Sequence, residues 1–138
     1  MKIGIDAMGG DFAPAECVKA VVTEANREDN ELHFFLFGEE DSLKLYATEL
    51  NHPNISIIHT GDSIGMAEHA TKAVASKKDS SINVGMLYLS EDKIDAFLSA
   101  GNTGAMMVSA LYQIKTIHGI DRPALSSVLP QQSGITGV

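Results

Sequence analysis

Two glycine-rich turns hold the residues of this sequence that are best suited to bind a small anion. The first turn, "DAMGGD" (6–11), contains the adjacent Gly9 and Gly10. The second turn, "SAGNTG" (99–104), places Asn102 between two glycines. Glycine turns expose backbone N–H groups, and the N-terminus of a following helix adds a positive partial charge. Together these features suit phosphate or a developing oxyanion.

Asn102 and Asp6 are the candidate catalytic residues within these turns. The Asn102 amide can donate a hydrogen bond to phosphate or to an acyl carbonyl, although Asn also tolerates a left-handed backbone in a turn. Asp6 can orient the first turn or position a donor, and Asp11 has the features of turn and helix-cap chemistry. Neither carboxylate is expected to contact phosphate directly. The candidate binding residues of the two turns are Gly9, Gly10, Ser99, Gly101, Thr103 and Gly104.

The glycine spacing does not match the common nucleotide-binding patterns. The sequence has no GxGxxG pattern, and neither turn runs into GK[ST], which argues against dinucleotide and P-loop sites. Either turn alone could serve only to reverse the chain. Two such turns at the ends of strands in one sheet favour a functional site, because ligands of open α/β sheets bind beyond the carboxyl ends of the strands.

Basic residues form one cluster, Lys72, Lys77 and Lys78, in an otherwise acidic chain. The cluster is either a solvated helix face or a site for phosphate and for an acidic protein partner. Arg122, in "GIDRPAL", can clamp an anion or form a surface or inter-subunit salt bridge. The five histidines show no metal-ligand spacing with cysteine or carboxylates, so we expect no metal site.

Hydrophobic periodicity predicts strands that alternate with helices. This alternation indicates a single α/β domain over residues 1–138, with three layers, helix/sheet/helix, around a mainly parallel sheet. Pro14 suits a first helical position, "KDSS" suits a helix cap, Gly119 suits a helix stop and Pro130 suits the end of a strand. The strands are expected at 2–6, 31–38, 55–60, 94–100 and 124–130, and the helices at 15–28, 39–50, 70–78, 82–92 and 105–117.

Composition narrows the classes of function. A formal net charge of −8 argues against nucleic-acid binding. The single Cys17 excludes an internal disulfide, and apolar runs are too short to span a bilayer. We therefore expect a soluble, cytoplasmic protein. The apolar end "ITGV" predicts a longer fold that is truncated at its C-terminus.

Four sequence blocks resemble the phosphate acyltransferase family, also called acyl-acyl-carrier-protein:phosphate transacylase. The blocks are "IDAMGGDFAP", "KKDSS", "DAFLSAGNTGAMM" and "GIDRPAL", and they occur in the family's order. The resemblance extends from Met1 to about Val138, the N-terminal portion of a fold more than twice as long. His69 and Ala70 stand where many members carry Lys-Pro, and His69 can replace the positive charge of that lysine only when it is protonated.

The resemblance implies that inorganic phosphate attacks a fatty acyl thioester of acyl carrier protein, giving acyl phosphate for phospholipid synthesis. It implies no cofactor, a homodimer in the cytoplasm, and peripheral membrane association through the missing C-terminal part. Two alternatives remain open. One is a phosphotransacetylase-like enzyme that uses acyl-coenzyme A. The other is a non-catalytic fragment that binds ligand or dimerises through an unpaired sheet edge.

Overall fold

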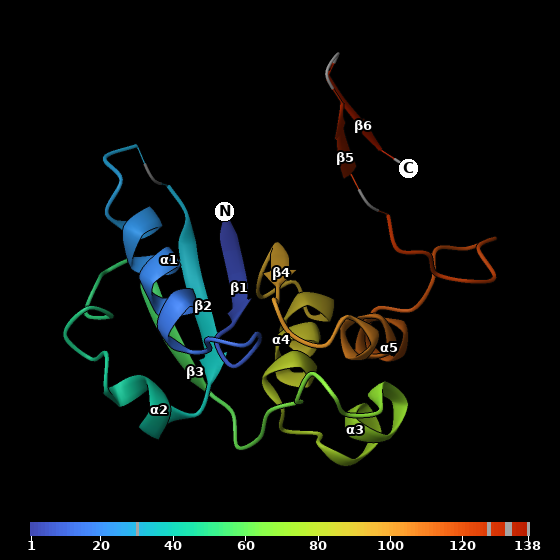
Figure 1. The fold of residues 1–138 in the computed structure, drawn as a ribbon, viewed down its shortest axis with the longest axis horizontal. Helices are drawn as coiled ribbons and strands as arrows, with labels where there is room; N and C mark the ends of the chain where they lie inside the picture. Colours follow the sequence, from blue (N-terminus) through green and yellow to red (C-terminus); the bar gives the residue numbers. More distant parts are fainter. Residues whose placement is uncertain (30, 127, 132–133, 138) are drawn as a thin grey trace.

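The predicted parallel sheet is confirmed by a computed structural model, which describes residues 1–29, 31–126, 128–131 and 134–137. Its four strands are β1 (Lys2–Asp6), β2 (His33–Gly38), β3 (Ile55–His59) and β4 (Ala96–Leu98). They lie in the order β3-β2-β1-β4, and every pairing is parallel. Figure 1 shows β1 and β2 at the centre of this sheet.

Side chains of β2 alternate between the two faces of the sheet, as expected for a strand that is buried on both sides. Phe34 and Leu36 join a core cluster with Val18 and Val21 of α1 (Ala15–Ala25). Phe37 instead joins Met86 of α4 (Ser81–Ser90) and Phe97 of β4. Helices α1 and α4 therefore cover opposite faces of the sheet (Figure 1).

The remaining long helix, α5 (Thr103–Gln113), packs mainly on α3 (Ala70–Ser76) and α4. A buried polar pair joins these helices: the Ser109 hydroxyl donates to Asn83 Oδ1 at 2.7 Å, and Asn83 Nδ2 donates to the Val74 carbonyl at 3.0 Å. Buried hydrogen bonds of this kind specify one packing, because an unpaired partner would be costly. They hold the start of α5 at a fixed place beside the sheet.

The topology reverses direction between β1 and β4. From β1 the chain moves outward through β2 and β3, and then it returns to pair β4 with the other side of β1. Such a switch point opens a crevice at the carboxyl ends of the two strands, where α/β proteins bind ligands. The register pairs Ile5 with Leu98, so the next residues, Asp6 and Ser99, lie side by side. Both glycine turns thus begin at the switch point.

Several predicted helix ends were wrong. Helix α2 is Glu40–Lys44 and not 39–50. After Lys44 the amide N–H groups of Tyr46 and Ala47 bond three residues back, so the chain continues in turns and the α-helix ends. Helix α5 ends at Gln113, where Lys115 adopts a φ of 69° and its N–H bonds the Ala110 carbonyl. Lys115 thus takes the stop position that was expected for Gly119.

Two further local predictions differ from the structure. Pro14 is the N-cap of α1 and not its first helical residue, and no side chain caps this helix, so Asp11 does not act as a cap. Pro130 lies within β5 (Val128–Gln131), which pairs antiparallel with β6 (Gly134–Gly137), so it does not end a strand. The expected cap of α4 is confirmed, since Ser80 Oγ accepts the Asn83 N–H. Within the described ranges, no helix is long and apolar enough to cross a bilayer.

Candidate functional site at the switch point

The two glycine turns are joined by a short hydrogen-bond relay. Ser99 Oγ donates to Asp6 Oδ2 at 2.6 Å and accepts the Gly101 N–H at 2.9 Å. The other Asp6 oxygen, Oδ1, accepts the Met8 N–H at 3.1 Å. Asp6 is only 2% exposed, and these bonds satisfy a carboxylate that would otherwise be costly to bury. Asp6 is therefore bonded to both turns, directly to Met8 and Ser99 and through Ser99 to Gly101.

Gly9 and Gly101 are required by the close approach of the two turns. A Cβ on Gly9 would lie 2.5 Å from Asp6 Oδ2 and 2.8 Å from both the Gly101 nitrogen and Ser99 Oγ. A Cβ on Gly101 would lie 3.1 Å from the Gly9 Cα. Gly10 has a φ of +100°, which a residue with a side chain rarely adopts. The glycines thus let two backbones meet and do more than reverse the chain.

Backbone donors surround this junction. The N–H groups of Gly10, Thr103 and Gly104 have no acceptor among the described residues. Thr103 and Gly104 form the first turn of α5, where N–H groups lack intrahelical partners and the helix dipole is positive. Donors of this kind suit phosphate or an oxyanion. Anion binding by these residues stays a prediction.

The Asn102 side chain is used within the protein. Its Oδ1 accepts the Ala105 N–H at 3.0 Å, which caps α5. Its Nδ2 lies 3.2 Å from the Gly65 carbonyl, 3.3 Å from that of Met66 and 3.0 Å from that of Glu68. Two N–H donors thus serve three carbonyl oxygens. Direct donation by Asn102 to a substrate stays a prediction, and it requires one of these bonds to be exchanged.

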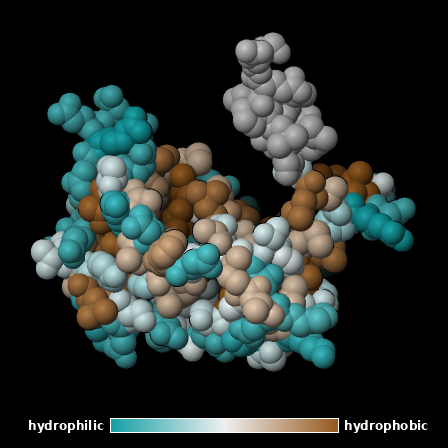
Figure 2. Space-filling model, in the orientation of Figure 1, coloured by the Kyte–Doolittle hydropathy of each residue, from teal (hydrophilic) through white to brown (hydrophobic). Residues whose placement is uncertain are grey.

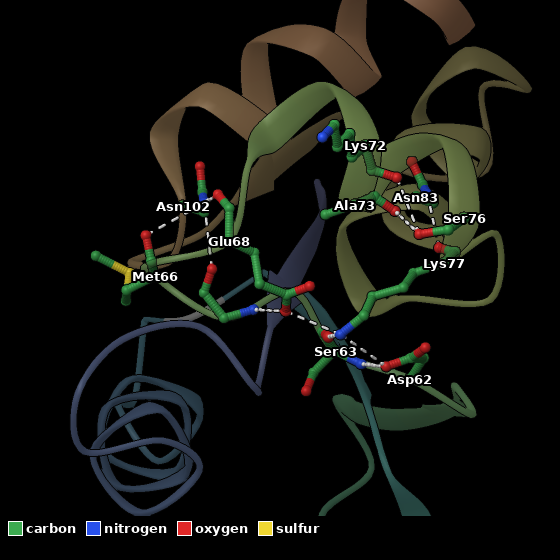
Figure 3. A network of polar contacts seen from close by, with 11 residues as sticks. Asp62, Ser63, Met66, Glu68, Lys72, Ala73, Ser76, Lys77, Asn83 and Asn102 are labelled. Carbon is green, nitrogen blue, oxygen red and sulfur yellow. Dashed lines mark hydrogen bonds and ion pairs between the residues drawn. The ribbon is translucent and has the colours of Figure 1, made fainter.

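A segment of the chain, residues 62–68, lies between Asn102 and Lys77, as Figure 3 shows. Lys77 Nζ lies 2.7 Å from the Ser63 carbonyl, 2.8 Å from Glu68 Oε1 and 3.3 Å from Asp62 Oδ1. Glu68 Oε1 also accepts the Gly65 N–H at 2.7 Å. This segment, which we call the 62–68 segment, is therefore tied to α3 on one side and to α5 on the other.

Acid should weaken the tie between Glu68 and Lys77. The Lys77 hydrogen bond first, and then the Gly65 N–H, lower the pKa of the Glu68 carboxyl from its usual value. Because folding lowers this pKa, the ion pair stabilises the fold at pH values above the usual pKa of a Glu carboxyl. This stabilisation is lost as the pH falls through the lower pKa of the folded state. We expect a ¹³C NMR titration of the Glu68 carboxyl to show its midpoint below the usual value. A midpoint at or above that value would contradict the ion pair.

The "KKDSS" block also holds the start of this segment. Asp79 Oδ2 accepts the Gly61 N–H at 2.8 Å, and the Asp62 N–H donates to the Asp79 carbonyl at 3.2 Å. The Ser81 N–H donates in turn to the Asp62 carbonyl at 3.2 Å. The block is therefore one connected structural unit that anchors the 62–68 segment next to the switch point.

An apolar cavity of about 660 Å³ opens beside the first glycine turn. Hydrophobic residues gather in the hollow between α1 and β4 (Figure 2). Cys17 lines the cavity, and its Sγ lies 3.7 Å from the carbonyl oxygens of Asp6 and Gly9. Burial, reinforced by Asp6, raises the pKa of this thiol, which disfavours the nucleophilic thiolate at neutral pH. The residues lining the cavity include Ile5, Gly10, Phe12, Val21, Leu98 and Ser99.

The structure brings together most, but not all, of the predicted site residues. Lys77 is engaged with the 62–68 segment, whereas Lys72 and Lys78 are exposed and have no side-chain partner in the described part of the chain. Arg122 is exposed in the segment after α5, and no hydrogen bond or ion pair links it to a described residue. No group of metal-ligating side chains occurs among the residues that the structure describes. The predicted residues at the junction are Asp6, Gly9, Gly10, Ser99, Gly101, Asn102, Thr103 and Gly104.

Sequence reasoning missed the 62–68 segment as part of the site. Glu68 and Asp62 occur in an irregular stretch without a motif, and they lie far from Asn102 in the sequence. The available signal was the pair of lysines in "KKDSS", because a lysine that is partly buried needs an acidic partner. The structure supplies those partners from the irregular stretch.

The parallel sheet with helices on both faces defines an α/β protein, and the junction of the two glycine turns is its candidate site. A family described as "Fatty acid synthesis protein" matches residues 1–138, and the chain belongs to that family. Curated relatives named "Phosphate acyltransferase" include one from Thermoanaerobacterium thermosaccharolyticum, 43% identical over 136 residues. One from Dictyoglomus turgidum is 44% identical over 140 residues. The resemblance found in the sequence is confirmed.

The match covers nearly all of this chain but less than half of each relative. It includes 99% of the chain and 40% of the Thermoanaerobacterium protein, and 100% of the chain and 41% of the Dictyoglomus protein. A third relative of the same name, from Pelotomaculum thermopropionicum, is 43% identical, with 99% of the chain and 40% of the relative covered. The chain thus spans about two fifths of the length of these relatives.

Proposed function

We propose that this chain carries the phosphate-binding part of a phosphate acyltransferase that transfers a fatty acyl group from acyl carrier protein to inorganic phosphate. A phosphate oxygen attacks the thioester carbonyl carbon and a tetrahedral oxyanion forms. The C–S bond then breaks, and the thiolate leaves and takes a proton from water. The products are acyl phosphate and free carrier-protein thiol. The printed name of the relatives supports the reaction class.

One observation carries the proposal: the two glycine turns meet at the switch point and leave backbone N–H groups without an acceptor in the described part of the chain. Phosphate is already nucleophilic, and thiols with a pKa near 8.5 leave readily as thiolates, so no protein nucleophile is needed. The protein must position the reactants and stabilise the oxyanion. Gly10, Thr103 and Gly104 supply N–H donors for that task.

The apolar cavity gives the acyl group a place beside these donors. Its volume of about 660 Å³ lies within the range of small-molecule sites. The cavity extends from Gly10 and Ser99 along Leu98 and Val21, so an acyl chain in it would hold its carbonyl next to the glycine turns. This placement is part of the proposal.

Lys72 and Lys78, the two exposed lysines of the basic cluster, are proposed to help recruit an acidic carrier protein. We expect Lys72→Glu with Lys78→Glu to raise KM for the carrier-bound substrate several-fold at low salt, because the exposed charges would repel the partner. The effect should shrink as salt screens it. Steady-state kinetics at two ionic strengths check this expectation, and an unchanged KM at low salt would remove both lysines from the docking surface.

The choice of thioester decides between the two enzyme hypotheses. Carrier-protein and coenzyme A thioesters of one fatty acid should be compared as substrates, with release of free thiol as the readout. The proposal predicts the higher kcat/KM for the carrier-protein thioester. A higher value for coenzyme A would favour the phosphotransacetylase-like alternative.

Homodimer formation, cytoplasmic location and peripheral membrane contact are proposals that rest on the family resemblance alone.

A further inference from the structure

We infer that Lys77 is a positioning residue of the proposed acyl transfer, and that it acts by fixing the 62–68 segment against Asn102 at the start of α5. The inference rests on the proposed function and assigns Lys77 a role different from phosphate binding. It separates Lys77 from its neighbours Lys72 and Lys78, with which the sequence groups it. The contacts of the ammonium group, drawn in Figure 3, carry the inference.

The Lys77 ammonium is already engaged by oxygens of the protein, through two hydrogen bonds and an ion pair. A lysine offers three N–H donors, and three oxygens lie within 3.3 Å of Nζ: the Ser63 carbonyl, Glu68 Oε1 and Asp62 Oδ1. The side chain is 27% exposed, less than either acidic partner. Binding phosphate would require the ammonium to give up contacts that hold the 62–68 segment. A role in holding that segment agrees with all three distances.

The contacts continue from Lys77 to Asn102 without a gap. Glu68 joins Lys77 Nζ to the Gly65 N–H through one carboxylate oxygen. The Gly65 and Glu68 carbonyls then accept from Asn102 Nδ2, and Asn102 Oδ1 caps α5 at Ala105. The first turn of α5 contains Thr103 and Gly104, whose N–H groups are proposed to bind the anion. Loss of the Lys77 contacts would therefore disturb the placement of those donors.

The backbone at Lys77 is itself fixed. Asn83 Nδ2 donates to the Lys77 carbonyl at 2.8 Å, and the Ser80 N–H donates to the same oxygen at 3.1 Å. Asn83 is buried and also bonds Ser109 of α5. The ammonium thus projects from a rigid base toward a segment that has no regular secondary structure. Because the backbone at Lys77 is fixed, its side chain can hold the less regular 62–68 segment in one position, and not the reverse.

Lys77→Met tests the inference because it keeps an unbranched side chain, shorter by only one atom, and removes the charge and the donors. We expect faster hydrogen exchange at the Gly65 and Glu68 amides, and kcat reduced about tenfold or more, with KM for phosphate little changed. Lys77→Arg should restore most of the kcat. The control is Lys44→Met, because Lys44 makes two ion pairs but only within its own turn of chain, to Glu40 and Asp41. It should alter neither readout.

The two readouts separate the inference from the function on which it rests. Unchanged exchange at Gly65 and Glu68 in Lys77→Met would overturn the inference at any level of activity. A large rise in KM for phosphate, without faster exchange, would restore Lys77 as a ligand contact. If Lys77→Met exchanged faster but the unsubstituted chain had no phosphate-dependent activity, the contacts of Lys77 with the 62–68 segment would be supported. The proposed function would then be overturned.

Discussion

Gly9→Ala is expected to lower kcat/KM by about 100-fold, because the two turns can no longer meet in their present geometry. The added methyl would lie 2.5 Å from Asp6 Oδ2 and 2.8 Å from the Gly101 nitrogen. These neighbours are a buried carboxylate and backbone, so they cannot move aside as a flexible side chain would. The same clash should reduce the free energy of unfolding by about 1–3 kcal/mol. Kinetics and urea unfolding measure the two effects.

Gly119→Ala is the matched control for Gly9→Ala. Gly119 has a φ of +88°, and a Cβ there would meet nothing within 4 Å. The substitution should cost about 1 kcal/mol through backbone strain and leave the kcat/KM of folded protein unchanged. If Gly9→Ala proved as active as Gly119→Ala at equal fractions of folded protein, the junction of the turns would have no part in catalysis.

Asn102→Ala is expected to lower kcat by tenfold or more. The structure adds a second route to the loss predicted from the sequence, since the amide both caps α5 and binds three carbonyls of the 62–68 segment. Removal of the cap alone should cost about 1 kcal/mol of stability. Turnover and the free energy of unfolding should therefore both fall. Near-normal turnover in a stably folded variant would exclude Asn102 from the mechanism.

Asn102→Asp separates the cap from the contacts to the segment. A carboxylate keeps an acceptor for the Ala105 N–H but has no donors for the carbonyls of Gly65 and Glu68, which it would repel. We expect helix α5 to keep its first turn and kcat to fall nearly as far as in Asn102→Ala. If kcat stayed close to that of the unsubstituted chain, the cap alone would account for the role of Asn102.

The parallel sheet, and the placement of both glycine turns at the ends of its strands, were predictable because they depend on local patterns. Dense apolar runs such as "FFLF" predict a strand that is buried on both faces, and two glycine turns after strands predict one edge of a parallel sheet. The Asp6–Ser99 bond then follows from pairing β1 with β4. The sequence could not show that β4 returns to the side of β1, since strand order depends on packing over long separations.

Three features of the structure could not be predicted from the local sequence pattern. The pattern over residues 39–50 is helical, yet α2 ends at Lys44, because the amide N–H groups of Tyr46 and Ala47 bond three residues back, to the carbonyls of Leu43 and Lys44. Lys115 adopts a left-handed backbone that favours glycine, so Gly119 was the natural but wrong choice. The role of Lys77 was equally hidden, because its acidic partners lie in a stretch without periodicity.

Phosphate-dependent release of carrier-protein thiol from a fatty acyl-acyl carrier protein, catalysed by this chain, tests the central claim most directly. The account predicts that thiol appears only when phosphate is present, in step with an acyl phosphate that hydroxylamine traps. Equal release without phosphate would indicate thioester hydrolysis. No release from folded chain would show that residues 1–138 do not hold the site for the reaction. Either result would contradict the account.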